Sequence, residues 1–217
     1  MQPKDHKYLR LFWILPVILV FIVAILAYFQ LPETIPIHWG IEGTADRWGS
    51  KAEALFIIPG IMLAFLILLF YIPKIDPMKK HYASFADVYY LFGFMFLAYF
   101  ALIYFAVIGQ TLGYDFDFPK LIMVLMGLLL IFCGYIMPKI KQNWFFGIRL
   151  PWTLSSEKVW NKTHSFSKPW FIILGILTII LAFYDCVICL YVMIGGILLL
   201  ILTLAIYSYL EYSKYQK

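Results

Sequence analysis

Five long runs of this sequence carry almost no ionised side chain, and this feature leaves few folds open to the chain. A helix of about 20 apolar residues crosses the ~30 Å hydrocarbon core of a bilayer. At about 1.5 Å per residue the last run would extend about 60 Å, so it must turn back near its one charge, Asp185, and cross twice. We therefore predict an all-α polytopic integral membrane protein with six transmembrane helices. The runs are 11–29, 54–72, 88–112, 121–137 and 169–210.

Composition agrees with a bilayer as the solvent. Of the 217 residues, 64% are apolar and only 13% are charged, which is too few to cover the surface of a water-soluble domain. The net charge of +5 does not indicate direct nucleic-acid binding, because the basic residues form short clusters between the apolar runs. The three cysteines are too few for a disulfide framework, and packing is their default role. Cys186 and Cys189 have redox spacing, but no neighbouring cation lowers a thiol pKa.

The distribution of lysine and arginine predicts the orientation. If the N-terminus is cytoplasmic, only Arg47, Lys51 and Lys120 of the 17 basic residues lie outside. Such an excess of cytoplasmic positive charge is the usual determinant of topology. We predict a multi-pass cell-membrane protein with both termini cytoplasmic, and a first run that is retained because it lacks a small-residue cleavage pattern. Trp13 and Trp170 are among the aromatic residues that fit interfacial belts.

Two connections are long enough to hold a site. We divide the chain into an N-terminal transmembrane hairpin, 11–73, with an external loop, 30–53, and a four-helix domain, 88–210, with a cytoplasmic loop, 138–168. The remaining connections, including 74–87, are short, and we expect no site in them.

The external loop combines prolines and glycines that forbid a long helix, which predicts an ordered turn-rich loop or a short hairpin. Its aromatic and charged residues either settle at the headgroup level or recognise an external ligand. The candidates for recognition are Glu33, His38, Trp39, Asp46, Arg47, Trp48 and Lys51.

The cytoplasmic loop is rich in aromatic residues. Ser155 is placed to cap a helix with Glu157 in its first turn, and later apolar residues recur at helical spacing, which predicts a helix lying in the inner interface. The loop is either a packed collar at the membrane boundary or a polar anchor for a partner. Arg149 offers a planar fork of donors for carbonyls, lipid phosphate or a partner's carboxylate.

No catalytic chemistry is indicated. The runs hold no ionisable group at mid-span, and the sequence has no zinc-binding, phosphate-loop or nucleophile-turn motif. We predict that the protein is not an enzyme and has no cofactor or metal. A transporter or permease-like protein for an amphipathic solute is the alternative, with the aromatic run 88–112 as a hydrophobic path. The sequence shows no paired, broken helices of the kind found in inverted-repeat transporters.

Both loops resemble one known family. The cytoplasmic run is similar to the signature of the SdpI family of bacterial membrane immunity proteins, although it has Tyr135 and Leu150 where the family often has asparagine and threonine. The external run resembles a short uncharacterised domain that accompanies this signature. The signature residues taken as candidate site residues are Asn143, Gly147, Arg149, Pro151, Trp152, Thr153, Trp160, Thr163 and His164.

The resemblance implies a function that residue patterns alone do not give. It implies a non-enzymatic immunity and signalling protein that resists a secreted antimicrobial peptide toxin. The partners it implies are the lipid bilayer, the peptide toxin and a cytoplasmic DNA-binding repressor held at the membrane.

Overall fold

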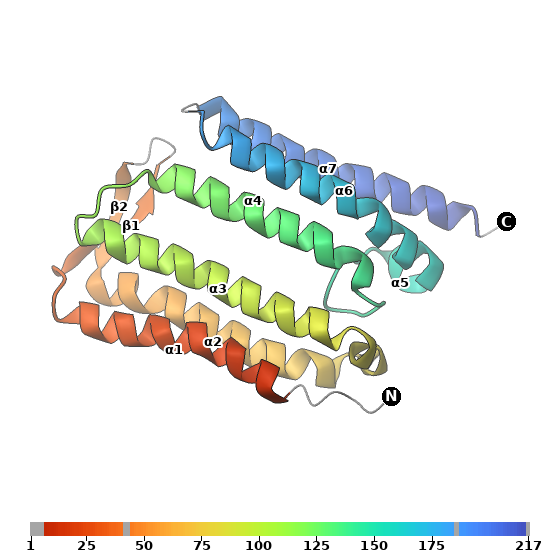
Figure 1. Ribbon diagram of the computed structural model, residues 1–217, viewed down its shortest axis with the longest axis horizontal. Coiled ribbons are helices and arrows are strands. Elements are labelled where there is room, and N and C mark those ends of the chain that lie inside the picture. Colours follow the sequence, from red (N-terminus) through yellow and green to blue (C-terminus); the bar gives the residue numbers. More distant parts are fainter. Residues whose placement is uncertain (1–6, 41–43, 185–186, 216–217) are drawn as a thin grey trace. The chain divides into compact units, whose positions relative to one another are not determined.

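The computed structural model describes residues 7–40, 44–184 and 187–215, and helices dominate this part of the chain (Figure 1). Six of these helices are long and apolar enough to cross a membrane, as the sequence predicted. They are α1 (Lys7–Tyr28), α2 (Lys51–Ile75), α3 (Ala86–Thr111), α4 (Phe118–Ile136), α6 (Glu157–Leu181) and α7 (Val187–Ser213). The turn predicted at Asp185 falls outside the described residues, between α6 and α7.

The chain forms two compact units. Unit 1 comprises Met1–Tyr71 and Tyr90–Ile122, and unit 2 comprises Ile72–Tyr89 and Met123–Lys217.

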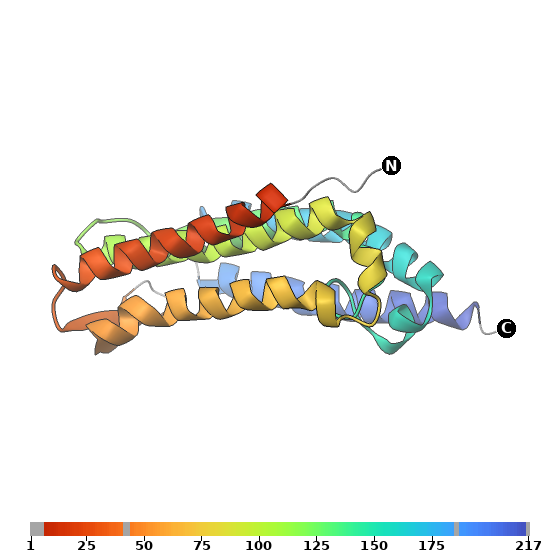
Figure 2. The same ribbon diagram turned by 90° about the horizontal axis from the view of Figure 1, so that it is seen from below.

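In unit 1 the connection between α1 and α2 contains a two-stranded antiparallel sheet (Figures 1 and 2). Strand β1 (Thr34–Trp39) pairs with β2 (Ala45–Ser50), and the register slips on either side of His38. The short hairpin predicted for this loop is confirmed. The Ser50 hydroxyl accepts a hydrogen bond from Glu53 N–H (3.2 Å), so the end of the sheet also caps α2.

Trp13 lies inside unit 1 rather than in an interfacial belt. Its side chain is only 1% exposed, and its indole N–H donates to the Tyr90 carbonyl on α3 (2.7 Å). The ring lies against Phe70 of α2, and a Cβ on Gly93 of α3 would meet it at 2.6 Å. The interfacial prediction is wrong for Trp13 because the carbonyl satisfies the indole N–H within the protein, where no headgroup or water is needed.

In unit 2, α4 and α6 approach each other through glycines. A Cβ on Gly127 would lie 2.6 Å from the Gly175 carbonyl oxygen, and one on Gly175 would lie 2.6 Å from the Gly127 carbonyl oxygen. Small residues allow such contact where the lipid tails supply no hydrophobic force between helices. On its other side α6 packs against α7 through a core of Leu174, Leu200 and Leu204.

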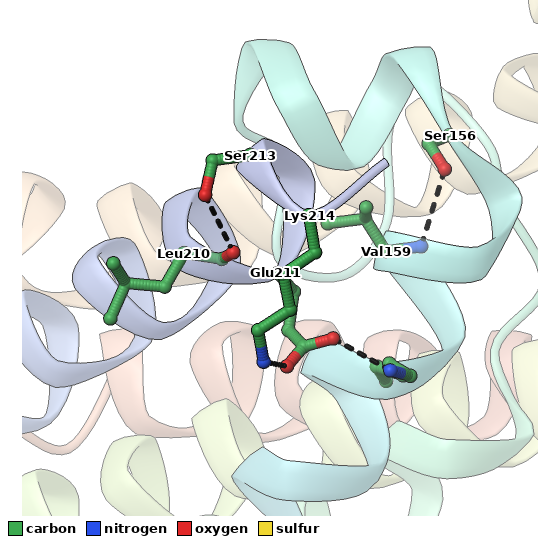
Figure 3. A network of polar contacts seen from close by, with 7 residues as sticks. Ser156, Val159, Leu210, Glu211, Ser213 and Lys214 are labelled. Atoms are coloured by element: carbon green, nitrogen blue, oxygen red, sulfur yellow. Dashed lines mark hydrogen bonds and ion pairs between the residues drawn. The ribbon is translucent and has the colours of Figure 1, made fainter. Parts of the chain in front are cut away.

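The start of α6 differs in detail from the predicted interfacial helix. Its cap is Ser156, whose hydroxyl accepts from Val159 N–H (3.4 Å), and not Ser155 (Figure 3). From Glu157 the helix continues through Pro169 into the fifth membrane span. A proline inside a membrane helix is tolerated when neighbouring groups satisfy the freed carbonyl. A separate short helix, α5 (Pro151–Ser155), precedes α6.

The glycine contact predicts a stability difference. Gly175→Ala should destabilise the protein by about 1–3 kcal/mol, because the new methyl group meets backbone that cannot move aside. Gly195→Ala on α7 is the matched control, because a Cβ there meets nothing within 4 Å. Thermal unfolding in detergent measures both variants, and equal melting temperatures would contradict the close α4–α6 contact.

Candidate functional site

The signature segment, residues 138–168, begins with a turn built on Asn143. This side chain is fully buried, and its Oδ1 accepts from the N–H groups of Phe145 (2.9 Å) and Phe146 (2.6 Å). Its Nδ2 donates to the carbonyls of Lys141 and Phe146, at 2.8 Å each. The amide group therefore uses both its donors and its acceptor to fold the chain around itself.

Gly147 and His164 lie in close contact and hold the next part of the segment. Gly147 has a φ of +107°, and a Cβ there would lie 2.5 Å from Nε2 of His164, so glycine is required on both counts. Nε2 accepts from Ile148 N–H (3.0 Å), and Nδ1 lies 2.8 Å from the Trp160 carbonyl. Because Nε2 is the acceptor, Nδ1 carries the proton and donates it, which makes His164 a neutral ring.

Trp160 and Thr153 continue this network. Trp160 is fully buried, stacks on His164 with ring centroids 4.1 Å apart, and donates to the Ile140 carbonyl (2.9 Å). The Thr153 hydroxyl accepts from Leu150 N–H (2.8 Å) and donates to the Ile148 carbonyl (2.8 Å). These bonds fix the entry into α5.

A tryptophan of α5 contacts α7. Pro151 occupies the first turn of α5, and the next residue, Trp152, donates from Nε1 to the Ser208 hydroxyl on α7 (2.6 Å). Its ring meets Tyr209 edge-on, with centroids 5.4 Å apart. Thr163 is also fully buried, and its hydroxyl has no hydrogen-bond partner among the described residues.

Arg149 alone among the predicted signature residues has an exposed charge. Its Nη1 donates to the Trp144 carbonyl (3.0 Å). The structure thus places Asn143 and Gly147 on one turn, which His164 of α6 holds through Ile148 N–H, and the exposed Arg149 donates to the Trp144 carbonyl of the same turn.

The connection 74–87 belongs to the same site, so the expectation that it holds none is wrong. Asp76 is 1% exposed and accepts from the N–H groups of Met78 (2.6 Å) and Trp144 (3.0 Å) and from the Tyr82 hydroxyl (3.0 Å). Burial and the Asp76 carboxylate raise the pKa of Tyr82. His81 Nδ1 lies 2.6 Å from the Gln142 carbonyl, to which it donates. One signal was available in the sequence, since Asp76 places a carboxylate among the lysines of a basic loop.

A second carboxylate that the sequence reasoning missed is Glu211, near the end of α7. It is 5% exposed and pairs with Lys162 of α6 (2.7 Å) and with Lys214. Figure 3 shows Glu211 and Lys214 beside the start of α6. A carboxylate with so little exposed surface is tolerated because two lysines that are themselves exposed cover it and compensate its charge.

The hairpin holds the residues predicted for recognition in two pairs and an exposed face. His38 and Asp46 pair across the sheet at 2.6 Å, with both side chains at least half exposed. Glu33 and Lys51 form an ion pair at 2.8 Å at the base of the hairpin.

The two tryptophans of the hairpin differ in exposure. Trp39 stacks on Phe118, with ring centroids 4.7 Å apart. Trp48 is 58% exposed, and the adjacent Arg47 is exposed as well. The free aromatic surface of the hairpin is therefore on β2.

The described residues contain no group of three or more His, Cys, Asp or Glu side chains that could hold a metal ion. Cys133 is a free thiol, whereas Cys189 is disulfide-bonded, so the packing role predicted for all three cysteines is wrong for Cys189. Cys186, which has redox spacing from Cys189 in the sequence, lies outside the described residues.

The six membrane-length helices define a multi-pass membrane protein, and comparison with known proteins shows its family. Residues 139–210 match the SdpI/YfhL protein family, and residues 11–63 match a domain of unknown function (DUF1648). The chain is 31% identical over 204 residues to Immunity protein SdpI of Bacillus subtilis (strain 168), covering 94% of each chain. An uncharacterized protein of Archaeoglobus fulgidus is 42% identical over 48 residues, which are 22% of this chain and 26% of that protein. No solved structure matches. The chain belongs to the SdpI family.

The Asp76 network predicts a local loss of order. In Asp76→Asn one of the three donors loses its acceptor, because an amide has a single acceptor oxygen, and we expect a cost of about 1–3 kcal/mol. Hydrogen exchange in residues 143–149 should speed up. Glu157→Gln is the control, since it makes the same change at an exposed acid of unit 2. Unchanged exchange in Asp76→Asn would show that the carboxylate does not hold the turn.

Proposed function

We propose that this protein gives its host immunity to a secreted antimicrobial peptide toxin, without enzymatic chemistry. One observation carries the proposal: the 31% identity to Immunity protein SdpI extends over 94% of both chains, so it includes the hairpin and the signature segment together. The sequence division into 11–73 and 88–210 stays a prediction within this proposal.

The proposed orientation puts the hairpin outside and both termini in the cytoplasm. The distribution of lysine and arginine supports it.

The hairpin is the proposed toxin-recognition element. Its pairs, His38–Asp46 and Glu33–Lys51, fix the sheet, while Arg47 and Trp48 stay exposed. Tryptophan and arginine are both enriched among the residues that contribute most to binding energy at protein interfaces. Together they offer an apolar surface and a cation to a bound peptide.

The signature segment is the proposed element of signalling, with a cytoplasmic DNA-binding repressor as the proposed partner. Lys139, Lys141, Lys158 and Lys168 are exposed here against one exposed acid, Glu157, while Asp76 and Glu211 are buried. The exposed side of the segment is therefore basic, which suits an acidic surface on a partner protein.

The structure supports the transport alternative less than it supports the immunity proposal. The aromatic residues of α3 contact one another and α2: Phe96 lies 4.4 Å from Phe65 and 4.9 Å from Phe100 between ring centroids, and Tyr104 is fully buried. These contacts favour packing over a hydrophobic path.

The immunity proposal predicts a selective loss of protection. The double variant Arg47→Ala, Trp48→Ala should bind the toxin at least about tenfold more weakly and lower survival of a toxin-sensitive host, with unchanged abundance in the membrane. Trp170→Ala is the control, since it removes a similarly exposed tryptophan from α6. Killing by the toxins encoded beside the gene is measured in cells that express each variant. If wild-type chain gives no protection against any of them, the proposed function is wrong.

The orientation is tested separately by thiol labelling. Arg47→Cys should react with a membrane-impermeant thiol reagent on intact cells, and Asn161→Cys should react only after permeabilisation, because both positions are exposed and lie on opposite sides of the proposed topology. The parent chain without an introduced cysteine gives the background. The reverse pattern would invert the topology.

A further inference from the structure

Residues 144 and 145, at the tip of the signature turn, have their aromatic side chains directed away from the protein. Trp144 is 49% exposed and Phe145 is 36% exposed. The next residue, Phe146, turns inward and packs against Phe85 and Tyr89. Two adjacent large apolar side chains are thus left uncovered by a segment that is otherwise well packed.

Side chains pair with six backbone groups of this tip. The N–H groups of Trp144, Phe145, Phe146 and Ile148 all donate to side chains, namely those of Asp76, Asn143 and His164. The carbonyls of Trp144 and Phe146 accept from Arg149 and Asn143. Irregular backbone normally cannot leave water, because unpaired polar groups are costly in an apolar medium. Here side chains lower that cost for the six groups that they pair with.

The surroundings of the tip are cationic. Residues 139–149 include Lys139, Lys141 and Arg149, all exposed, and no acidic residue. Asp76 is buried and engaged by its three donors, so its charge is held inside. The Arg149 guanidinium has five N–H donors, and the Trp144 carbonyl takes only one of them. The remaining fork suits the oxygens of a phosphate group.

The tip is also close to a membrane boundary along the chain. Helix α4 ends at Ile136, and Trp144 follows eight residues later. The headgroup layer extends roughly 5–7 Å beyond the hydrocarbon on each side, within reach of such a short segment.

We propose that residues 144–149 form an anionic-phospholipid binding site, in which Trp144 and Phe145 insert among the headgroups and Arg149 binds a lipid phosphate. Exposed aromatic rings next to basic residues, on a backbone whose N–H groups pair largely with side chains, have the chemistry of an interfacial anchor. The occupant is therefore the membrane in which the protein sits. This site is independent of the proposed toxin recognition, which involves only the hairpin.

The test uses the full-length protein reconstituted in vesicles. Phe145→Cys, in a background with the native cysteines replaced, is labelled with a bimane fluorophore, and Lys80→Cys in the exposed part of residues 79–84 is the matched control. Quenching by a lipid that carries a nitroxide near its headgroup is compared with quenching by aqueous iodide. We expect the dye at position 145 to be quenched several-fold more by the nitroxide lipid than the dye at position 80, and less by iodide.

A second arm tests the phosphate contact. Vesicles that contain phosphatidylglycerol are compared with vesicles of phosphatidylcholine alone, in the Phe145→Cys background with Arg149 intact or changed to Gln or Lys. We expect the anionic lipid to deepen insertion with Arg149, to do so more weakly with Arg149→Lys, and to have no effect with Arg149→Gln.

Three results would overturn the proposal. Equal quenching by iodide at positions 80 and 145 in every vesicle would mean that the tip stays in water. Equal lipid quenching at positions 80 and 145 would mean that the tip is not a special anchor. A tip that stays in water, combined with lost signalling in Trp144→Ala, would assign the aromatic pair to a protein partner instead.

Discussion

The need to pair every backbone N–H and C=O group near the bilayer determines most of the structure of the described chain. Within the six long helices the backbone pairs with itself, which is why uncharged apolar runs suffice to specify them. Between Lys139 and Pro151 the chain has no such regular structure. There the partners are side chains: Asn143 folds the turn, His164 holds Ile148, and Asp76 reaches in from a distant part of the sequence. Their burial follows from this role, because a side chain can replace water as a partner only where water is excluded.

The two buried carboxylates of unit 2 meet the cost of burying charge in different ways. Asp76 is stabilised by two backbone N–H groups and the Tyr82 hydroxyl, and burial together with the nearby carboxylate raises the pKa of Tyr82. Hydrogen bonds to a carboxylate favour its charged form without neutralising it. Glu211 is instead paired with Lys162 and Lys214. The donors to Asp76 are directional, so they fix the conformation of the backbone around it. The lysines that pair with Glu211 are compact cations, and Lys162 links α7 to α6.

The sequence predicted the features that depend on neighbouring residues. The six spans follow from local hydropathy, and the hairpin follows from the local density of proline and glycine. Features that depend on distant residues were missed: the Trp13 indole bonds a carbonyl 77 residues away, and Asp76 bonds an amide 68 residues away. A single sequence does not reveal such pairs, since the same residue types would serve equally well at an interface. The cap of α6 was misplaced by one residue because Ser155 and Ser156 both suit the position, and only the backbone geometry distinguishes them.

Asp76 contributes to the signature turn although it lies outside the regions that match the family. The matched regions are 11–63 and 139–210, so Asp76, His81 and Tyr82 lie in the interval between them. These residues nevertheless supply an acceptor to Trp144, a donor to the Gln142 carbonyl and a donor to Asn143, the last at 3.4 Å. The turn at 141–149 is therefore completed by a segment that lies about 60 residues upstream. It follows that residues 139–210 do not form a structurally independent unit, because without the interval one buried amide of the turn would lose its acceptor and a buried carbonyl its donor.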